Sequence, residues 1–195
     1  MPRQSALVSA GLIALLAAGC ASPPARFYTL SAASAPAAPP SGRSVSVGPV
    51  SVPESVDRPE MVLADGPNQV RIDEFNRWAS PLKSEIARAV AENLVLMLGT
   101  DRVTQAAQTA TADVQYRALI EVQRLDSTPG EAVAFEAVWV VRRTADGKSL
   151  TGRTRVREPL SESGYPAVAA AHSRAVARLS EDIAEAVRSL EAAPR

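Results

Sequence analysis

The chain has 195 residues, a length that fits one domain better than two. Its 46% hydrophobic and 22% charged residues are typical of a globular protein rather than a disordered tail. The 21 basic and 21 acidic residues cancel, which argues against binding nucleic acid by overall charge. One cysteine and one histidine exclude an internal disulfide and leave no cysteine–histidine cluster for a structural zinc ion. We therefore expect no metal site.

The first 20 residues have the pattern of an export signal. A positive charge at Arg3 precedes the uncharged run SALVSAGLIALLAA at 5–18. A helix needs about 20 apolar residues to cross a bilayer, so this run fits the apolar part of a secretory signal instead. The run LLAAGC then ends at Cys20 and resembles the lipobox of bacterial lipoproteins. A buried cysteine on an ordinary helix fits the position and flanks less well.

The lipobox resemblance implies a signal peptide at 1–19, cleavage before Cys20 and a covalent lipid on the cysteine sulfur. Two or more acyl chains make a stable anchor, whereas one alone is marginal. Apart from this lipid we expect no cofactor. Ala21 stands where an aspartate favours retention in the inner membrane of Gram-negative bacteria. We therefore expect the outer membrane, with the protein on its periplasmic face.

The segment 20–43 is rich in proline, alanine and serine, a composition that favours extended, solvated chain. We interpret it as a tether between the anchor and the domain. The apolar island RFYTL at 26–30 interrupts this composition. A short first strand docked on the domain explains the island better than a stray apolar cluster.

Regular patterns begin at residue 44, and they predict one domain over 44–195. Alternating apolar residues predict strands, and clusters of glycine, proline and aspartate predict the turns between them. The predicted strands are 44–50, 61–65, 69–72, 113–125, 131–143 and 149–158.

Two amphipathic helices complete the predicted fold. The first has Ser80 as its N-cap, Pro81 at the first helical position and Gly99 at its end. Its apolar stripe is Leu82, Ile86, Val90, Leu94 and Met97 or Leu98. The second helix covers about 165–190. Its stripe is Val168, His172, Val176, Leu179, Ile183, Val187 and Leu190. We expect a single mixed α/β domain in which a mixed sheet is covered by the two helices.

The sequence has no recognisable catalytic centre. It lacks the G-x-S-x-G pattern of a nucleophile elbow. The GKS at 147–149 lacks the first glycine of a P-loop, since Arg142 stands there, and we read it as part of a hairpin turn. His172 lies on an apolar stripe, where a packed histidine is the expected role. We therefore expect no enzymatic activity.

Seven residues are candidates for docking a partner. Arg153, Arg155 and Arg157 share one face of a predicted strand. They either pair with glutamates of neighbouring strands, which we favour, or bind headgroups or an acidic partner. Trp78 either packs between a loop and the first helix, which we favour, or anchors an interface. The loop 53–60 adds Glu54, Asp57 and Arg58.

Two further stretches carry a family resemblance: VGPVSVPESVDRPEMV at 47–62 and NRWASPL at 76–82. With the early FYTL and the lipobox, they resemble the ABC-type transport auxiliary lipoprotein family, of which paraquat-inducible protein C is a member. The resemblance implies an accessory lipoprotein of an MCE-type lipid transport system, whose MCE proteins form tunnels between the two membranes. It implies no catalytic residue.

The assembly expected from this resemblance is a homo-oligomeric ring that meets the end of an MCE tunnel. A ring satisfies several equivalent edges of the tunnel at once, whereas a monomer satisfies only one. The alternative is an accessory lipoprotein that regulates a cell-wall synthase or a machine for surface-polymer assembly. A periplasmic hydrolase is the weakest interpretation, because the chain lacks a catalytic pattern.

Overall fold

The structure is a computed structural model that describes residues 23–33, 37–106 and 114–193. Cys20 and the predicted signal peptide lie outside the described residues. The elements in chain order are β1 (Arg26–Tyr28), β2 (Val45–Ser51), β3 (Glu60–Ala64), β4 (Val70–Trp78), α2 (Leu82–Leu98), β5 (Val103–Gln105), β6 (Tyr116–Thr128), β7 (Ala132–Arg143), β8 (Ser149–Pro159) and α3 (Tyr165–Ala192). None of the described helices combines the length and the apolar content that a membrane-spanning segment needs.

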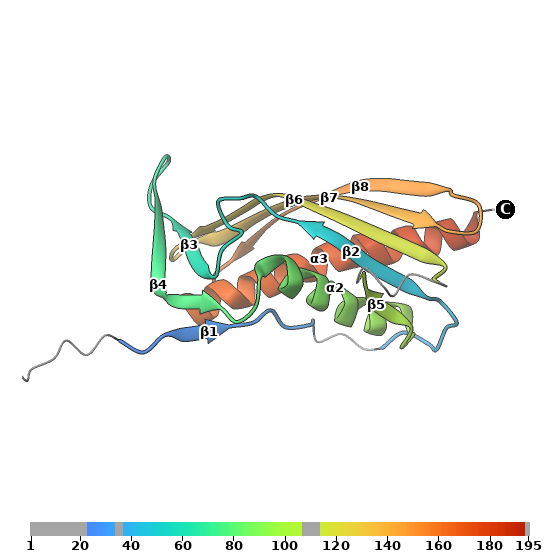
Figure 1. Ribbon diagram of the computed structural model, residues 1–195, viewed down its shortest axis with the longest axis horizontal. Helices are drawn as coiled ribbons and strands as arrows, with labels where there is room; N and C mark the ends of the chain where they lie inside the picture. The colour runs from blue at the N-terminus through green and yellow to red at the C-terminus, as the bar shows by residue number, and fades with distance from the viewer. Residues whose placement is uncertain (1–22, 34–36, 107–113, 194–195) are drawn as a thin grey trace, which may run out of the picture.

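The strands form two sheets rather than the single sheet expected from the sequence. Five strands are ordered β5-β2-β6-β7-β8, and three are ordered β1-β4-β3. Figure 1 shows α2 and α3 beneath the larger sheet, with the smaller sheet across one end of the molecule. The loop after β2 connects the two sheets, since β2 lies in the larger one and β3 in the smaller. The predicted class, a single mixed α/β domain with two covering helices, is confirmed.

The core lies between the five-stranded sheet and the helices. Both predicted helical stripes are buried, apart from Met97, which is partly buried at the edge of the core. Along β6 and β7 the predicted alternation is also observed, with Ala118, Ile120 and Ala137 facing inward. The turn between β7 and β8 is the predicted hairpin, with Gly147 at positive φ.

The start of α2 differs by one residue from the prediction. Pro81, not Ser80, is the N-cap, and no side chain caps the helix. The Pro81 carbonyl accepts the amide protons of Ser84 at 2.8 Å and Glu85 at 3.1 Å, so the helical bonds begin there. The predicted end is confirmed, since Gly99 takes the left-handed conformation with φ 62°.

The described part of the predicted tether is packed on the domain. β1 pairs in parallel with β4, which confirms the short strand, and the Leu30 side chain is only 1% exposed. The Leu30 amide donates to Glu85 at 3.0 Å, and the Ala33 amide donates to Asn93 at 2.7 Å. The folded unit therefore includes β1 and begins before the predicted boundary at residue 44.

Further along, the same segment runs beside the C-terminal half of α2. The Ala38 amide donates to the Leu96 carbonyl at 2.8 Å, and the Ser41 amide donates to the Gly99 carbonyl at 2.7 Å. The proline-rich chain thus satisfies orphan carbonyls at the helix end, which would otherwise need water or a cap. A composition that cannot build its own core is here stabilised by another element.

Candidate docking surfaces

The arginine row of β8, which consists of Arg153, Arg155 and Arg157, is the most strongly charged candidate, and each of its members forms an ion pair within the chain. Arg153 and Arg155 both pair with Glu136, the latter at 3.1 Å. Arg157 pairs with Glu131 at 2.9 Å. These contacts follow from the register, in which Glu136 of β7 lies opposite Arg155. The cross-strand pairing favoured from the sequence is what the structure contains.

The electrostatic effect is visible at Glu136. The hydrogen bond from Arg153 lowers the pKa of this carboxyl, and the bond from Arg155 acts in the same direction. Glu136 is therefore ionised at neutral pH. A partner that binds the arginine row must compete with this carboxylate or bind across the pair.

Beside the arginine row the outer face of the large sheet becomes apolar. A shallow hollow of about 290 Å³ lies over β6 and β7, next to the end of β2. Its lining residues are Pro49, Ser51, Leu119, Ile120, Glu121, Val138, Trp139 and Val140. Val138 lies opposite Arg153 in the ladder, so the apolar and charged parts adjoin.

The loop at 53–60 has a buried residue at its centre and mostly exposed residues on either side of it. Val56 is buried, while Glu54 and Asp57 are exposed and Arg58 is half-buried. Asp57 forms an ion pair with Lys83 of α2, with 3.2 Å between the carboxylate oxygen and the ammonium nitrogen. The loop follows β2, which is separated from β8 by β6 and β7. With strands spaced about 4.8 Å apart, β2 and β8 lie about 14 Å apart. The loop and the arginine row are therefore two surfaces within one chain.

Trp78 is buried, so the alternative in which it anchors an interface is wrong for this conformation. Its ring packs edge-to-face on His172, with centroids 5.3 Å apart at 79°. His172 is equally enclosed: Nδ1 lies 3.0 Å from the Val168 carbonyl oxygen, and Nε2 lies 3.2 Å from the Ser127 hydroxyl oxygen. Desolvation lowers the pKa of His172 to about 4, so the ring is neutral at neutral pH.

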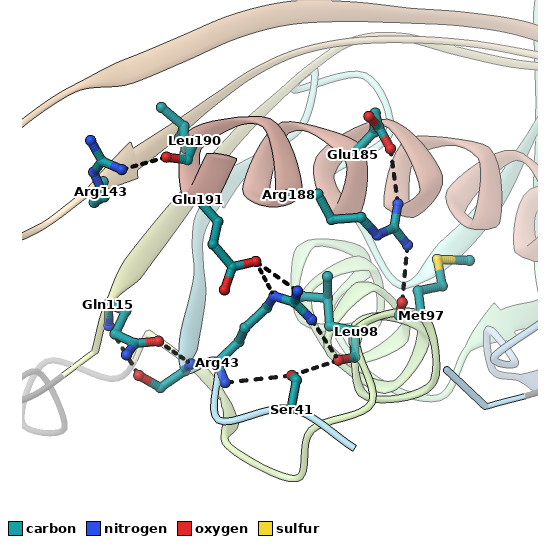
Figure 2. Close-up of polar contacts among 11 residues, drawn as sticks. Ser41, Arg43, Met97, Leu98, Gln115, Arg143, Glu185, Arg188, Leu190 and Glu191 are labelled. Atoms are coloured by element: carbon teal, nitrogen blue, oxygen red, sulfur yellow. Dashed lines mark hydrogen bonds and ion pairs between the residues drawn. The ribbon is translucent and has the colours of Figure 1, made fainter. Parts of the chain in front are cut away.

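A polar cluster closes the opposite end of the molecule (Figure 2). Arg43 donates to Glu191 at 2.6 and 2.8 Å and to the Leu98 carbonyl at 3.3 Å, which joins the ends of α2 and α3. Arg143 of β7 donates to the Leu190 carbonyl of α3. These contacts fix both helix ends to the sheet.

An open hollow of about 890 Å³ lies at this end. Its lining residues are Ser44, Arg102, Val114, Gln115, Tyr116, Arg143, Thr144, Ala145, Asp146, Glu191 and Ala193. The hydrogen bond from Arg143 lowers the pKa of Asp146 to about 2. Asp146 is therefore ionised and ion-paired at neutral pH.

The family comparison matches this folded unit almost from end to end. The model of the ABC-type transport auxiliary lipoprotein component matches residues 28–184, from the last residue of β1 into the last turns of α3. The chain belongs to this family. The match begins at Tyr28, in agreement with the early start of the fold. No match is found among the curated proteins.

Solved structures share the fold at low sequence identity. An uncharacterized protein is 21% identical with a TM-score of 0.69, covering 85% of this chain and 99% of that one. Protein XCC0632 from Xanthomonas campestris is 18% identical with a TM-score of 0.66, covering 86% of this chain and 98% of that one. A PelC dodecamer from Paraburkholderia phytofirmans reaches a TM-score of only 0.38 at 14% identity, covering 75% and 93% of the two chains.

One surface was missed in the sequence analysis. Large apolar side chains of β1 and β4 are exposed on the three-stranded sheet, and Phe27 is the most exposed of them. The alternation that predicts a strand was visible at Val70 and Ile72, but it does not reveal which face is covered.

Proposed function

We propose that this protein is a non-enzymatic accessory lipoprotein of an MCE-type lipid transport system. It is anchored through lipidated Cys20 to the periplasmic face of the outer membrane, where it docks or receives the MCE tunnel. The family match over residues 28–184 carries this proposal, because it identifies an auxiliary lipoprotein of ABC-type transport. The LLAAGC run supplies the anchor, and Ala21 supports the outer membrane.

The polar side chains favour a binding role over a catalytic one. His172, the single histidine of the sequence, is enclosed and neutral, with both ring nitrogens engaged. Within residues 23–33, 37–106 and 114–193, no three His, Cys, Asp or Glu side chains gather as metal ligands would. The proposed role needs neither a metal nor a cofactor.

The proposed docking unit is a homo-oligomeric ring. A head-to-tail contact joins two different surfaces of one chain, and the ring closes when the rotation between neighbours allows it. The arginine row and the loop with Glu54, Asp57 and Arg58 are two such surfaces. The Arg153, Arg155 and Arg157 side chains are already paired, so the contact extends an ion-pair network rather than neutralising bare charge. Trp78 has no part in this contact, because its indole side chain is buried.

The test is co-purification of the full-length lipoprotein with MCE proteins from its own envelope. We expect an MCE protein in the complex, and loss of acyl labelling in Cys20→Ser. Ala21→Asp should move the protein into inner-membrane fractions. Capture of a cell-wall synthase or a surface-polymer machine without any MCE protein would replace the proposal with the alternative.

The ring is tested by analytical ultracentrifugation of the lipoprotein with Arg153→Glu and Arg155→Glu combined. We expect a closed oligomer for the original chain and its loss in the variant. Arg188→Glu serves as a control for charge reversal, because Arg188 is an exposed residue of α3, outside both the β8 row and the loop. The ring would be excluded if the original chain were a monomer with and without the MCE partner, and if the double variant bound this partner as well as the original chain does.

A further inference from the structure

The three-stranded sheet presents large apolar side chains to solvent at one end of the molecule. Phe27 is 63% exposed, Val70 57%, Ile72 43% and Phe75 36%. We call these four residues the apolar end face. In the described residues, the other exposed large apolar side chains are Leu119 and Leu150, both on the five-stranded sheet. In Figure 1, β1, β3 and β4 stand together at the end farthest from the C-terminus.

The strand register shows why Val70 and Ile72 point outward. Ile72 lies opposite Val62, and Val70 lies opposite Ala64. The intervening residues of β3, Met61 and Leu63, are buried, so the inner face of this sheet is the packed one. Val70 and Ile72 therefore share the outer face.

The same argument applies to β1. Tyr28 lies opposite Trp78, which is buried, and the Tyr28 ring packs near Tyr165 of α3 with centroids 6.3 Å apart. Phe27 precedes Tyr28 by one residue and lies opposite Arg77. Its side chain therefore points to the outer face of the sheet. A phenylalanine on this side gains nothing from the core, and leaving it in water forfeits the benefit of burying it.

The position of the anchor identifies what covers this face. Cys20 precedes Arg26, the first residue of β1, by six residues. Six residues span at most about 22 Å when fully extended. A lipid on Cys20 therefore holds this end of the molecule, and not the opposite one, close to the bilayer surface. Exposed apolar patches on soluble domains mark protein or membrane contacts, and here the membrane is already within reach.

We propose that the apolar end face is the membrane-contacting surface of the protein. Phe27, Val70, Ile72 and Phe75 lie in the headgroup region of the leaflet that holds the lipid of Cys20. The inference rests on the proposed lipidation and adds to it a fixed orientation of the domain. The ion pair of Arg77 with Glu60 lies on the same side of the sheet, because Arg77 is opposite Phe27 in the ladder. Binding is therefore governed by apolar contact rather than by the anionic lipid content.

The single cysteine makes a sharp test possible. Since the lipid occupies Cys20, a second cysteine is the one free thiol of the mature lipoprotein. Ile72→Cys carries an environment-sensitive fluorophore on the apolar end face. Leu150→Cys is the matched control, because Leu150 is 38% exposed and lies on β8 of the other sheet. Both full-length lipoproteins are added to vesicles of phosphatidylethanolamine and phosphatidylglycerol, and iodide in the outer solution quenches accessible labels.

We expect a blue-shifted emission and a several-fold lower quenching constant at position 72, with water-like values at position 150. The same contrast is expected in vesicles of phosphatidylcholine alone. A label at Phe27→Cys, on a different strand, repeats the measurement if the label at 72 disturbs β4. Equal quenching of the labels at 27, 72 and 150 would overturn the inference.

Two other outcomes are separable from this one. The intact mass shows whether the lipid is present, and its absence contradicts the proposed anchor rather than the orientation. Protection that weakens as the protein is diluted into excess lipid shows that a second copy covers the face. That result would also overturn the membrane contact.

Discussion

The outer face of the five-stranded sheet carries the paired arginine row beside a shallow apolar hollow, whereas the outer face of the three-stranded sheet exposes four large apolar side chains. On β8, Arg153 and Arg155 share Glu136 of β7, and Arg157 pairs with Glu131, the residue just before β7. On β4, Val70 and Ile72 meet only small or apolar residues of β3 across the ladder. A repeated charge is weak evidence for binding when the next strand supplies its counter-charge. An exposed apolar face is stronger evidence, because water gives it no partner.

The comparison holds only if the small sheet belongs to the same folded unit as the large one, and Leu30 tests this most strongly. Leu30 and Leu94 are 1% and 0% exposed, so Leu30→Ala and Leu94→Ala should each cost about 2–5 kcal/mol. The measurement is urea unfolding of a soluble chain covering residues 23–195. If the segment before residue 44 were a loose tether, Leu30→Ala would leave the free energy of unfolding nearly unchanged while Leu94→Ala lowered it.

Trp78 of the small sheet packs on the buried ring of His172, and the burial of this ring is measurable by pH. Its pKa falls from 6.5 to about 4 on folding because burial disfavours the charged ring. The unfolded chain therefore binds more protons between these values, and stability rises with pH across that window. Relative to pH 7, we expect a loss of about 3 kcal/mol as the pH falls through 6.5 to 4. In His172→Gln this slope should disappear, and an unchanged slope would assign the effect to other groups.

Close packing on the inner face of the large sheet predicts a smaller effect at Gly152. A Cβ atom there would lie 2.1 Å from the Trp139 ring. The indole Nε1 donates to Thr154 at 3.1 Å, so the ring is held where it is. Gly152→Ala should cost about 1–3 kcal/mol through overpacking. Gly42→Ala is the control, since no atom lies within 4 Å of its added Cβ. Equal unfolding midpoints for the two variants would mean that Trp139 moves aside freely.

The smallest effect is expected on the outer face of the large sheet. Arg157 and Glu131 form an exposed pair, and such pairs contribute about 0–1 kcal/mol. A double-mutant cycle with Arg157→Ala and Glu131→Ala should give a coupling energy at the low end of this range. A larger coupling would mean that the arginine row stabilises the fold and is poorly suited to exchange partners.

Much of the architecture was predictable, because it depends on local periodicity. The stripes of α2 and α3 and the alternation along β6 are each set by residues close together in the sequence. The docking of the early segment was not, since Leu30 and Ala33 bind Glu85 and Asn93, which lie 55 and 60 residues further on. The division into two sheets likewise depends on where β1 and β4 meet.

The candidate surfaces were predictable to different degrees. The pairing of the β8 arginines was an expected alternative, since a hairpin fixes which glutamates lie opposite. The burial of Trp78 was also anticipated, but its contact with His172 joins residues from distant elements. The apolar end face was not foreseen, because alternation in a strand gives two faces and does not say which one another layer covers.

The long helix α3 sets the distance between the two ends of the molecule. Its 28 residues, at about 1.5 Å each, make a rod of about 42 Å. Tyr165 at its first residue donates to Asp73 of β4 at 2.5 Å, and the Leu190 carbonyl near its last residue accepts from Arg143. The rod therefore ties the small sheet at one end to the Arg143 cluster at the other. In the proposed membrane-bound orientation, with the axis of α3 along the membrane normal, that cluster would lie about 40 Å from the bilayer surface, at a distance set by helix length rather than by a flexible linker.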